Sequence, residues 1–152
     1  MQPMFEGHVL PILRERAGGR VLRTRVLRIA SMGESDVEQV VAPGSEGEFG
    51  VLPGHAPVLV ELKPGVVRWI ESGRNRRAAI TGGFAEVTLE RVTVLAPIAE
   101  LAEQIDATEA ERRRSDAATA LSNIGSAAPP EQVAKLRDVV ECAQARVDAL
   151  RG

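Results

Sequence analysis

The sequence is short of cysteine, aromatic residues and long apolar runs. Its single cysteine, Cys142, excludes an internal disulfide and fits a reducing compartment. Aromatic residues make up 3% of the chain, and Trp69 is the only tryptophan, which argues against aromatic ligand cages and base-stacking platforms. No apolar run approaches the roughly 20 residues that span a bilayer. Any membrane association is therefore expected to pass through a partner.

The chain also lacks a strong excess of charge of either sign. Its formal net charge is −2, which gives no reason to expect nucleic acid as a partner. What is present is the composition of a globular protein, because 44% of the 152 residues are hydrophobic and 26% are charged. This length suits one ordinary domain or two small units.

The region between residues 20 and 97 is made of short apolar segments separated by turn residues. The turn signals include Lys63-Pro64-Gly65 and Gly82-Gly83, and no helix-length stretch lies between the segments. This spacing predicts strands of about four to seven residues in an antiparallel sandwich or barrel.

The pattern becomes helical after Pro97. Asp106 is a good N-cap, and Glu109 stands three residues later, where a capping box requires it. The sequence therefore predicts a helix over residues 106–123, an interruption at 123–130, and a second helix with Pro130 in its first turn.

Two apolar stripes predict that these helices pack together. The second helix has a heptad-like seam with steps of three and four residues: Val133, Leu136, Val140, Ala143, Val147 and Leu150. The first helix has a stripe with small residues that allow close approach: Ala107, Ala110, Ala117, Leu121 and Ile124. The predicted fold class is α+β, with an N-terminal antiparallel β-sandwich followed by an antiparallel two-helix hairpin. Because isolated helices of this length are marginal in water, the hairpin is expected to depend on the surface against which it docks.

The segment GSEGEFGVLPGHAP, residues 44–57, is the strongest candidate for a chemical site. It does not match a phosphate-binding loop, because Gly44 and Gly50 bracket acidic residues and no lysine follows to complete the site. Glu46, Glu48 and His55 are metal-ligating residue types, but their spacing matches no known ligand pattern. No Gly-x-Ser-x-Gly occurs, and Cys142 lies far along the chain from either histidine. The glycines and prolines are explained by turns, and the two glutamates then lie on an exposed rim that suits a contact surface.

Three blocks closely resemble the epsilon subunit of bacterial F-type ATP synthases. They are PGSEGEFGVLPGHAPVLVELKPGVVR at 43–68, GGFAEV at 82–87 and RVTVLAPIAE at 91–100. The resemblance implies a β-sandwich of about ten strands over residues 20–100, a regulatory helical hairpin over 101–152, and an N-terminal extension over 1–19.

The resemblance also implies a function and partners. A family member is a non-catalytic rotor subunit of the central stalk that couples the gamma subunit to the c-ring of a proton-translocating enzyme. Its hairpin can lie against the sandwich, or extend toward the alpha and beta subunits and restrain ATP hydrolysis. Such a subunit lies at the cytoplasmic face of the bacterial plasma membrane and meets that membrane only through the complex.

Several residues receive roles from the resemblance. Glu46, Glu48 and His55 are expected to contact the c-ring or gamma, although His55 also fits a turn histidine bonded to nearby backbone. A contact between the alpha/beta head and the run Arg112, Arg113 and Arg114 competes with a simple solvated basic face.

Family members that bind ATP on the hairpin resemble I-D-x-x-R-A, and this chain keeps only part of that motif. Ile105, Asp106 and Ala110 match it, but Glu109 replaces the arginine. A carboxylate at this position repels a triphosphate, so ATP binding is expected to be weak or absent, and no cofactor is expected. Two other functions remain open at this stage. One is an adaptor of another complex, and the other is a small enzyme that uses Glu46, Glu48 and His55.

Overall fold

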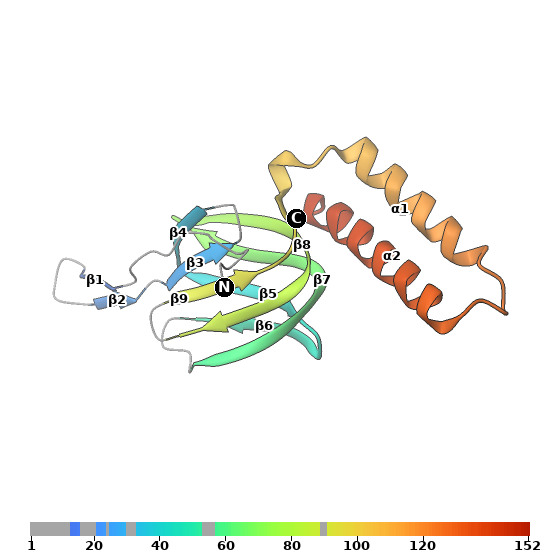
Figure 1. Ribbon diagram of the computed structural model, residues 1–152. Coiled ribbons are helices and arrows are strands. Elements are labelled where there is room, and N and C mark those ends of the chain that lie inside the picture. Colours follow the sequence, from blue (N-terminus) through green and yellow to red (C-terminus); the bar gives the residue numbers. More distant parts are fainter. Residues whose placement is uncertain (1–12, 16–20, 24, 30–32, 53–56, 89–90) are drawn as a thin grey trace.

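Figure 1 shows the computed structural model, in which a layered strand-rich unit carries two long helices at one end. The structure describes residues 13–15, 21–23, 25–29, 33–52, 57–88 and 91–152. These residues form ten strands: β1 Leu13–Glu15, β2 Val21–Arg23, β3 Arg25–Ile29, β4 Gly33–Val37, β5 Gln39–Gly44, β6 Gly47–Val51, β7 Val58–Glu71, β8 Arg74–Val87, β9 Arg91–Leu95 and β10 Ala99–Leu101. A 3-10 helix, η1 Ala102–Gln104, leads to the two helices α1 Ala107–Ser122 and α2 Pro130–Leu150.

Eight of these strands form one sheet, whose path runs β4-β3-β9-β8-β7-β5-β6, with β10 added on β8. The first two strands, β1 and β2, pair only with each other in the described part of the chain. The pairs are antiparallel except that β3 runs parallel to β9. The predicted β-sandwich followed by a helical hairpin is therefore confirmed. The parallel pair was not predicted, because it joins strands far apart in the sequence.

Two long strands, β7 and β8, continue through positions where the sequence predicts turns. The prediction that a strand ends at Lys63-Pro64-Gly65 is wrong, since β7 continues through it for 14 residues. The regular pairing of β7 with β5 is interrupted at this place, between the pairs Val41↔Arg68 and Gly44↔Leu62. Proline lacks a backbone N–H, so an interruption in the ladder is where a strand tolerates it.

The pair Gly82-Gly83 is a bend inside β8 and not the end of a strand, as the sequence had suggested. Both glycines have positive φ, 102° and 124°. A side chain at Gly83 would overlap the carbonyl of Leu95, so only glycine fits this close approach. On either side of the bend β8 pairs with different strands, with β10 before it and β9 after it. The bend thus lets one long hairpin serve both layers.

The core between the layers consists mainly of β-branched residues from alternate positions of the strands. Its largest fully buried side chains are Ile29, Ile80, Val37, Val40, Val51, Val67, Val87, Val92 and Val94. Trp69 joins the same cluster. Alternation within strands and close packing of branched side chains are what a sandwich interior requires.

The helices begin and end within a residue or two of the predicted bounds. Asp106 is the N-cap of α1, and its Oδ1 accepts a hydrogen bond from the backbone N–H of Glu109 at 2.8 Å. The carboxylate of Glu109 pairs with Arg113 four residues later, at 2.5 Å. Pro130 is the first residue of α2, as predicted. No helix in the described residues is both long and apolar enough to span a bilayer.

The predicted stripes describe only part of the helix packing. On α1, Ala110 and Ala117 are buried, but Ala107 is exposed, so its place in the stripe is wrong. On α2, Ala143 and Val147 are buried, and the other seam residues are half-buried. Burial also includes Ala145 and Ala149, which the seam left out. The reason is that the C-terminal half of α2 packs against β7 and β8 as well as against α1.

Candidate docking surfaces and hairpin cleft

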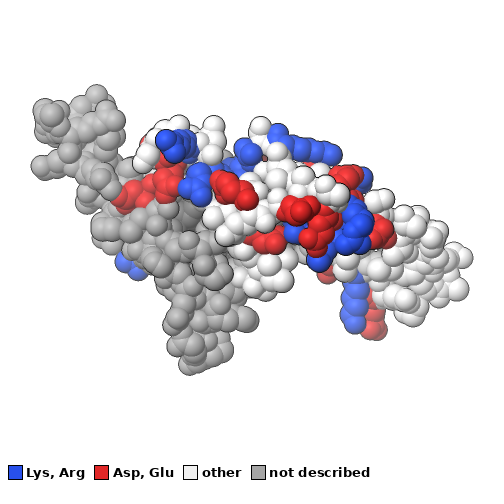
Figure 2. Space-filling model, turned by 90° about the horizontal axis from the view of Figure 1, so that it is seen from above, with Lys and Arg blue, Asp and Glu red and all other residues white. Residues whose placement is uncertain are grey.

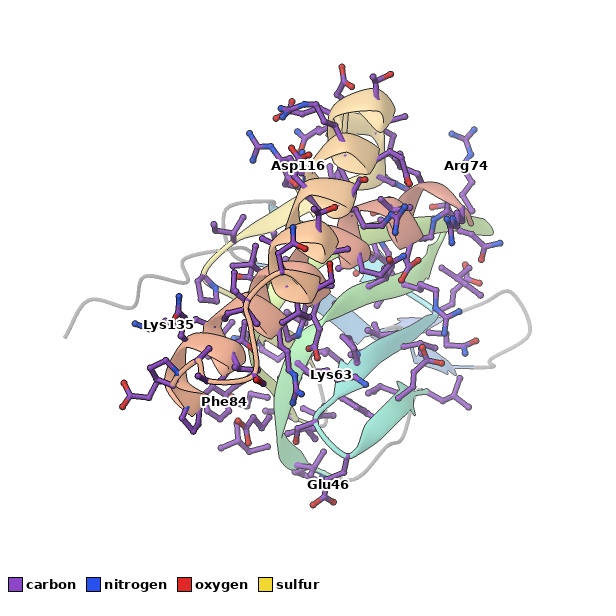
Figure 3. The ribbon with its side chains drawn as sticks, turned by 90° about the vertical axis from the view of Figure 1, so that its right-hand side faces the viewer. Glu46, Lys63, Arg74, Phe84, Asp116 and Lys135 are labelled. Carbon is purple, nitrogen blue, oxygen red and sulfur yellow. The ribbon has the colours of Figure 1, made fainter. Side chains whose placement is uncertain are left out.

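The segment that begins at Gly44 forms a tight turn between β5 and β6. Gly44 pairs with Gly47, so Ser45 and Glu46 lie at the tip. Gly47 has a φ of 136°, and a Cβ on Gly44 would lie 2.6 Å from the carbonyl oxygen of Gly47. Both glycines are therefore required by the turn. Glu46 is exposed at this tip and points away from the molecule at the edge of the sandwich opposite to Arg74 (Figure 3).

Glu48 and His55 have different outcomes in the structure. Glu48 follows the turn on β6, and its carboxylate lies 2.7 Å from the guanidinium of Arg68 on β7. Both side chains are about half exposed, so this ion pair is screened by solvent and contributes little to stability. His55 lies outside the described residues.

An apolar patch beside this turn was missed by the sequence reasoning. Leu59 is 66% exposed and Phe84 is 47% exposed, and the strand register places them close together on β7 and β8. Val58 and Leu52 are exposed as well, but Val58 pairs with the buried Val87 and so lies on the other face of the sheet. We call Leu59 and Phe84 the apolar patch. The signal for it was present in Val58-Leu59-Val60, because three consecutive apolar residues in a strand place at least one on each face.

A groove joins the turn and the patch. It has a volume of about 490 Å³ and runs between the β5–β6 turn and the start of β7, where Glu46, Glu48, Leu59 and Glu61 are among its lining residues. Acidic and apolar side chains thus share one end of the sandwich. Such an arrangement suits contact with a protein surface that is partly apolar and partly basic.

The three consecutive arginines of α1 are each paired with a carboxylate of the same helix. Arg112 pairs with Asp116 at 3.3 Å, Arg113 pairs with Glu109, and Arg114 pairs with Glu111. The hydrogen bond from Arg114 holds the pKa of the Glu111 carboxyl below its ordinary value and raises the pKa of the guanidinium. Acidic and basic side chains interleave over the middle of the view in Figure 2, whereas the loop end of the hairpin carries no charged side chain.

The residues that match the ATP motif all have roles in the hairpin itself. Ile105 and Ala110 are buried in the cluster between hairpin and sandwich, and Asp106 caps α1. Beside them lies a cleft of about 910 Å³ between α1, α2 and the strands β8 and β10. Its lining includes five carboxylates: Glu100, Asp106, Glu109, Asp116 and Asp138. It includes two guanidiniums, Arg113 and Arg146, and each of these is paired with a carboxylate.

The described residues show no arrangement for metal or thiol chemistry. No group of three or more His, Cys, Asp or Glu side chains among them is placed to hold a metal ion. Burial raises the pKa of the Cys142 thiol, and the charges of Asp138 and Glu141 raise it further. A raised pKa keeps a thiol protonated and unreactive at neutral pH.

The fold and these surfaces define a two-part protein, a β-sandwich with exposed acidic and apolar side chains at one end and a helical hairpin folded against it. Comparison with known proteins agrees with this class. The family description "ATP synthase, Delta/Epsilon chain, beta-sandwich domain" matches residues 26–102. The chain is 43% identical over 116 residues to the ATP synthase epsilon chain of Granulibacter bethesdensis. The aligned region covers 76% of this chain and 85% of that one. It is 51% identical over 83 residues to the epsilon chain of Pelotomaculum thermopropionicum, covering 53% of this chain and 62% of that one.

These matches show that the chain belongs to the ATP synthase epsilon-chain family. The fold is also that of a chain in the Euglena gracilis mitochondrial ATP synthase, with a TM-score of 0.68 at 20% identity over 91% of this chain and 89% of that one. A chain in the central stalk and c-ring structure of the Tetrahymena thermophila mitochondrial ATP synthase is similar over 84% of this chain and 95% of that one, with a TM-score of 0.51 at 16% identity.

Proposed function

We propose that the chain is a non-catalytic rotor subunit in the central stalk of a proton-translocating F-type ATP synthase. In this role the sandwich binds the gamma subunit and rests on the c-ring. The subunit lies at the cytoplasmic face of the bacterial plasma membrane and is held there by the complex. Membership of the epsilon-chain family and the name of the Tetrahymena structure support this role.

The observation that carries the proposal is the end of the sandwich where the acidic turn and the apolar patch meet. Exposed side chains as large as Leu59 and Phe84 are costly to leave in water when they lie together, and a partner that covers them gains their burial. Glu46 extends beyond them and can meet basic or polar groups at the rim of the same contact. We assign the apolar patch to the gamma subunit and the acidic turn to the loops of the c-ring.

The patch can be tested by placing charge on it. The double variant Leu59→Asp with Phe84→Asp is expected to lose copurification with gamma and the c-ring, because a buried unpaired carboxylate opposes association. Val139→Asp provides the matched control, since Val139 is 53% exposed but lies on α2. Unchanged copurification of the double variant, with the control also unchanged, would remove the patch from the docking site. Binding of the unaltered chain to another complex in place of gamma would favour the alternative, an adaptor.

We further propose that the hairpin restrains ATP hydrolysis when it reaches the alpha and beta subunits. The local ion pairs of Arg112 and Arg113 support this role, because both residues are well exposed and their carboxylate partners can be exchanged for those of another surface. Charge reversal of both arginines is expected to raise ATP hydrolysis by the assembled complex toward the rate obtained with a chain that ends at Gln104. That cut keeps β10 and η1 intact. Hydrolysis that stays at the unaltered rate in both variants would exclude the hairpin as the inhibitor.

Finally, we propose that the cleft does not bind ATP and that the subunit needs no cofactor. Five carboxylates line the cleft, and both of its guanidiniums are already paired with carboxylates. The cleft therefore repels a triphosphate instead of binding it. Isothermal titration with Mg-ATP is expected to give no binding at millimolar nucleotide. Micromolar affinity would contradict the proposal. The charge of residue 109 is tested by Glu109→Arg, which should bind ATP more tightly than the unaltered chain.

A further inference from the structure

The hairpin is attached to the sandwich mainly through one helix and mainly through small side chains. The helix that packs against β7 and β8 is α2, whereas α1 packs mainly against α2. The buried cluster at this junction contains Ile105, Val147 and four alanines: Ala79, Ala110, Ala145 and Ala149. Alanine buries little apolar surface, so this junction is weaker per residue than the valine-rich core of the sandwich.

Two arginine contacts cross the same junction on either side of Ala79. Arg146 of α2 places its Nε 2.6 Å from Glu100 Oε2 on β10, and the two side chains are only 18% and 34% exposed. Arg77 of β8 donates a hydrogen bond from its Nε to the backbone oxygen of Ala149 at 2.7 Å. The register places Glu100 opposite Ala79, and Arg77 lies two residues from Ala79 on β8. Both contacts therefore join the sandwich to the same turn of α2.

The contact made by Arg77 caps the C-terminal end of α2. The last turn of α2 contains no basic residue, although the last carbonyl groups of a helix need donors and carry partial negative charge. Arg77 supplies a donor and a positive charge from the sandwich. Undocking the hairpin therefore removes a cap from α2 as well as an interface.

The contact made by Arg146 is strong but incomplete. Its partly buried ion pair is less screened than the exposed pairs of α1. However, Nη1 of Arg146 is buried without a hydrogen-bond partner among the described residues. That group gains water when α2 leaves the sheet, which keeps the docked state from being excessively stable. A contact with these two properties suits an element that must be held and then released.

We propose that Arg77, Glu100 and Arg146 form an electrostatic latch that sets the fraction of hairpin docked on the sandwich. The regulatory meaning of the latch rests on the proposed function, but its existence concerns the isolated chain. The latch needs no nucleotide, because the carboxylate of Glu100 already occupies Arg146. Docking should therefore depend on ionic strength, since salt screens charged contacts much more than it weakens burial of alanine.

Hydrogen exchange in the full-length chain tests the latch. In the variant Arg77→Gln with Glu100→Gln, amides 145–149 are expected to exchange at least about ten-fold faster than in the unaltered chain, whereas β7 and β8 amides of the core stay protected. Raising the salt concentration should speed exchange at 145–149 in the unaltered chain and have little effect in the variant. The matched control is Arg74→Gln with Glu86→Gln, which removes two exposed charges from β8 outside the junction.

A charge swap separates a latch from general damage to the fold. The variant Glu100→Arg with Arg146→Glu restores an ion pair of opposite polarity and is expected to recover most of the protection that Glu100→Arg alone loses. Exchange at 145–149 within two-fold of the unaltered chain in the Arg77 and Glu100 variant, or no recovery in the swap, would overturn the latch. Neither result involves gamma. Loss of gamma binding with a salt-dependent latch would instead overturn the proposed function alone.

Discussion

The sandwich and the hairpin differ in how they are held together, although they belong to one short chain. The sandwich buries nine large β-branched side chains almost completely, and its strands are connected by a continuous network of backbone hydrogen bonds. The hairpin buries alanines at its junction with the sandwich and relies on a few arginine contacts. The size of the buried side chains thus makes one region rigid and lets the other detach. Large buried side chains stabilise the sandwich, and small ones allow the helical hairpin to undock.

The largest loss of stability is expected when a cavity is made in the sandwich core. Ile80→Ala is expected to destabilise the chain by roughly 2–5 kcal/mol, because it removes buried methyl groups and leaves a cavity. Ile98→Ala is the matched control, since Ile98 is 59% exposed and should change the free energy of unfolding very little. Urea unfolding followed by circular dichroism measures both. Equal effects from the two substitutions would show that the core is not the source of stability.

A smaller and more local effect is expected at the hairpin junction. Val147→Ala removes two methyl groups of a buried side chain, worth about 2 kcal/mol, and should loosen docking without lowering the unfolding midpoint of the sandwich. The control Val139→Ala changes a side chain of α2 that lies beside the cleft but is 53% exposed, and it should leave docking unchanged. Hydrogen exchange of α2 and of the sheet, recorded on the same sample, distinguishes the two regions. A common loss of protection in both would mean that hairpin and sandwich form one cooperative unit.

The start of α1 gives a still smaller effect. Asp106→Ala removes the hydrogen bond to the backbone N–H of Glu109 and should cost about 1 kcal/mol of helix stability. The substitution Asp138→Ala also removes an acidic side chain beside the cleft but leaves no helix cap vacant. Exchange rates in the first turn of α1 are the measurement. An equal response to both substitutions would assign the effect to the charge of the cleft and not to capping.

The smallest effect concerns pH. The Arg114 hydrogen bond lowers the pKa of Glu111 from its ordinary value of 4.5, so the carboxylate favours the folded helix. A depressed pKa gives a contribution that is present above that ordinary value and is lost as the pH falls through the lower folded value. Because both side chains are in contact with solvent, we expect only a slight decrease in α1 helicity below about pH 4.5, absent in Glu111→Gln. Circular dichroism measures this helicity. An equal decrease at low pH in the unaltered chain and in Glu111→Gln would show that this pair is not its cause.

The two-part architecture could be predicted from the sequence because its signals are local. Strand-length apolar segments with turn residues, the N-cap at Asp106 and Pro130 at the start of α2 all depend on neighbours within a few positions. The bend at Gly82-Gly83 and the passage of β7 through Pro64 were misjudged, because the same residues that end a strand can also bend one. Only pairing with β9, β10 and β5 decides between these outcomes.

The candidate site divides in the same way. The turn that exposes Glu46 follows from its glycines, and a carboxylate at residue 109 follows from the sequence. For the apolar patch, the local run Val58-Leu59-Val60 indicated only an exposed Leu59, and its proximity to Phe84 depends on strand register. The ion pair of Glu48 with Arg68 and the contacts of Arg77 and Arg146 join residues that are distant in the chain, so no local pattern could reveal them. The resemblance assigned Glu48 to a partner, and that contact stays a prediction.

Local sequence is enough to place a β-rich unit before two helices, because hydrophobic period and turn chemistry are properties of short stretches. The tertiary structure alone decided which long-range neighbours the strands have, which half of α2 touches the sheet, and which charges cross between the two units. These choices depend on distances between residues far apart in the chain, such as Arg77 and Ala149, which are 72 positions apart. Such distances are set by the packing of the whole chain, and packing is a collective result that no single segment encodes.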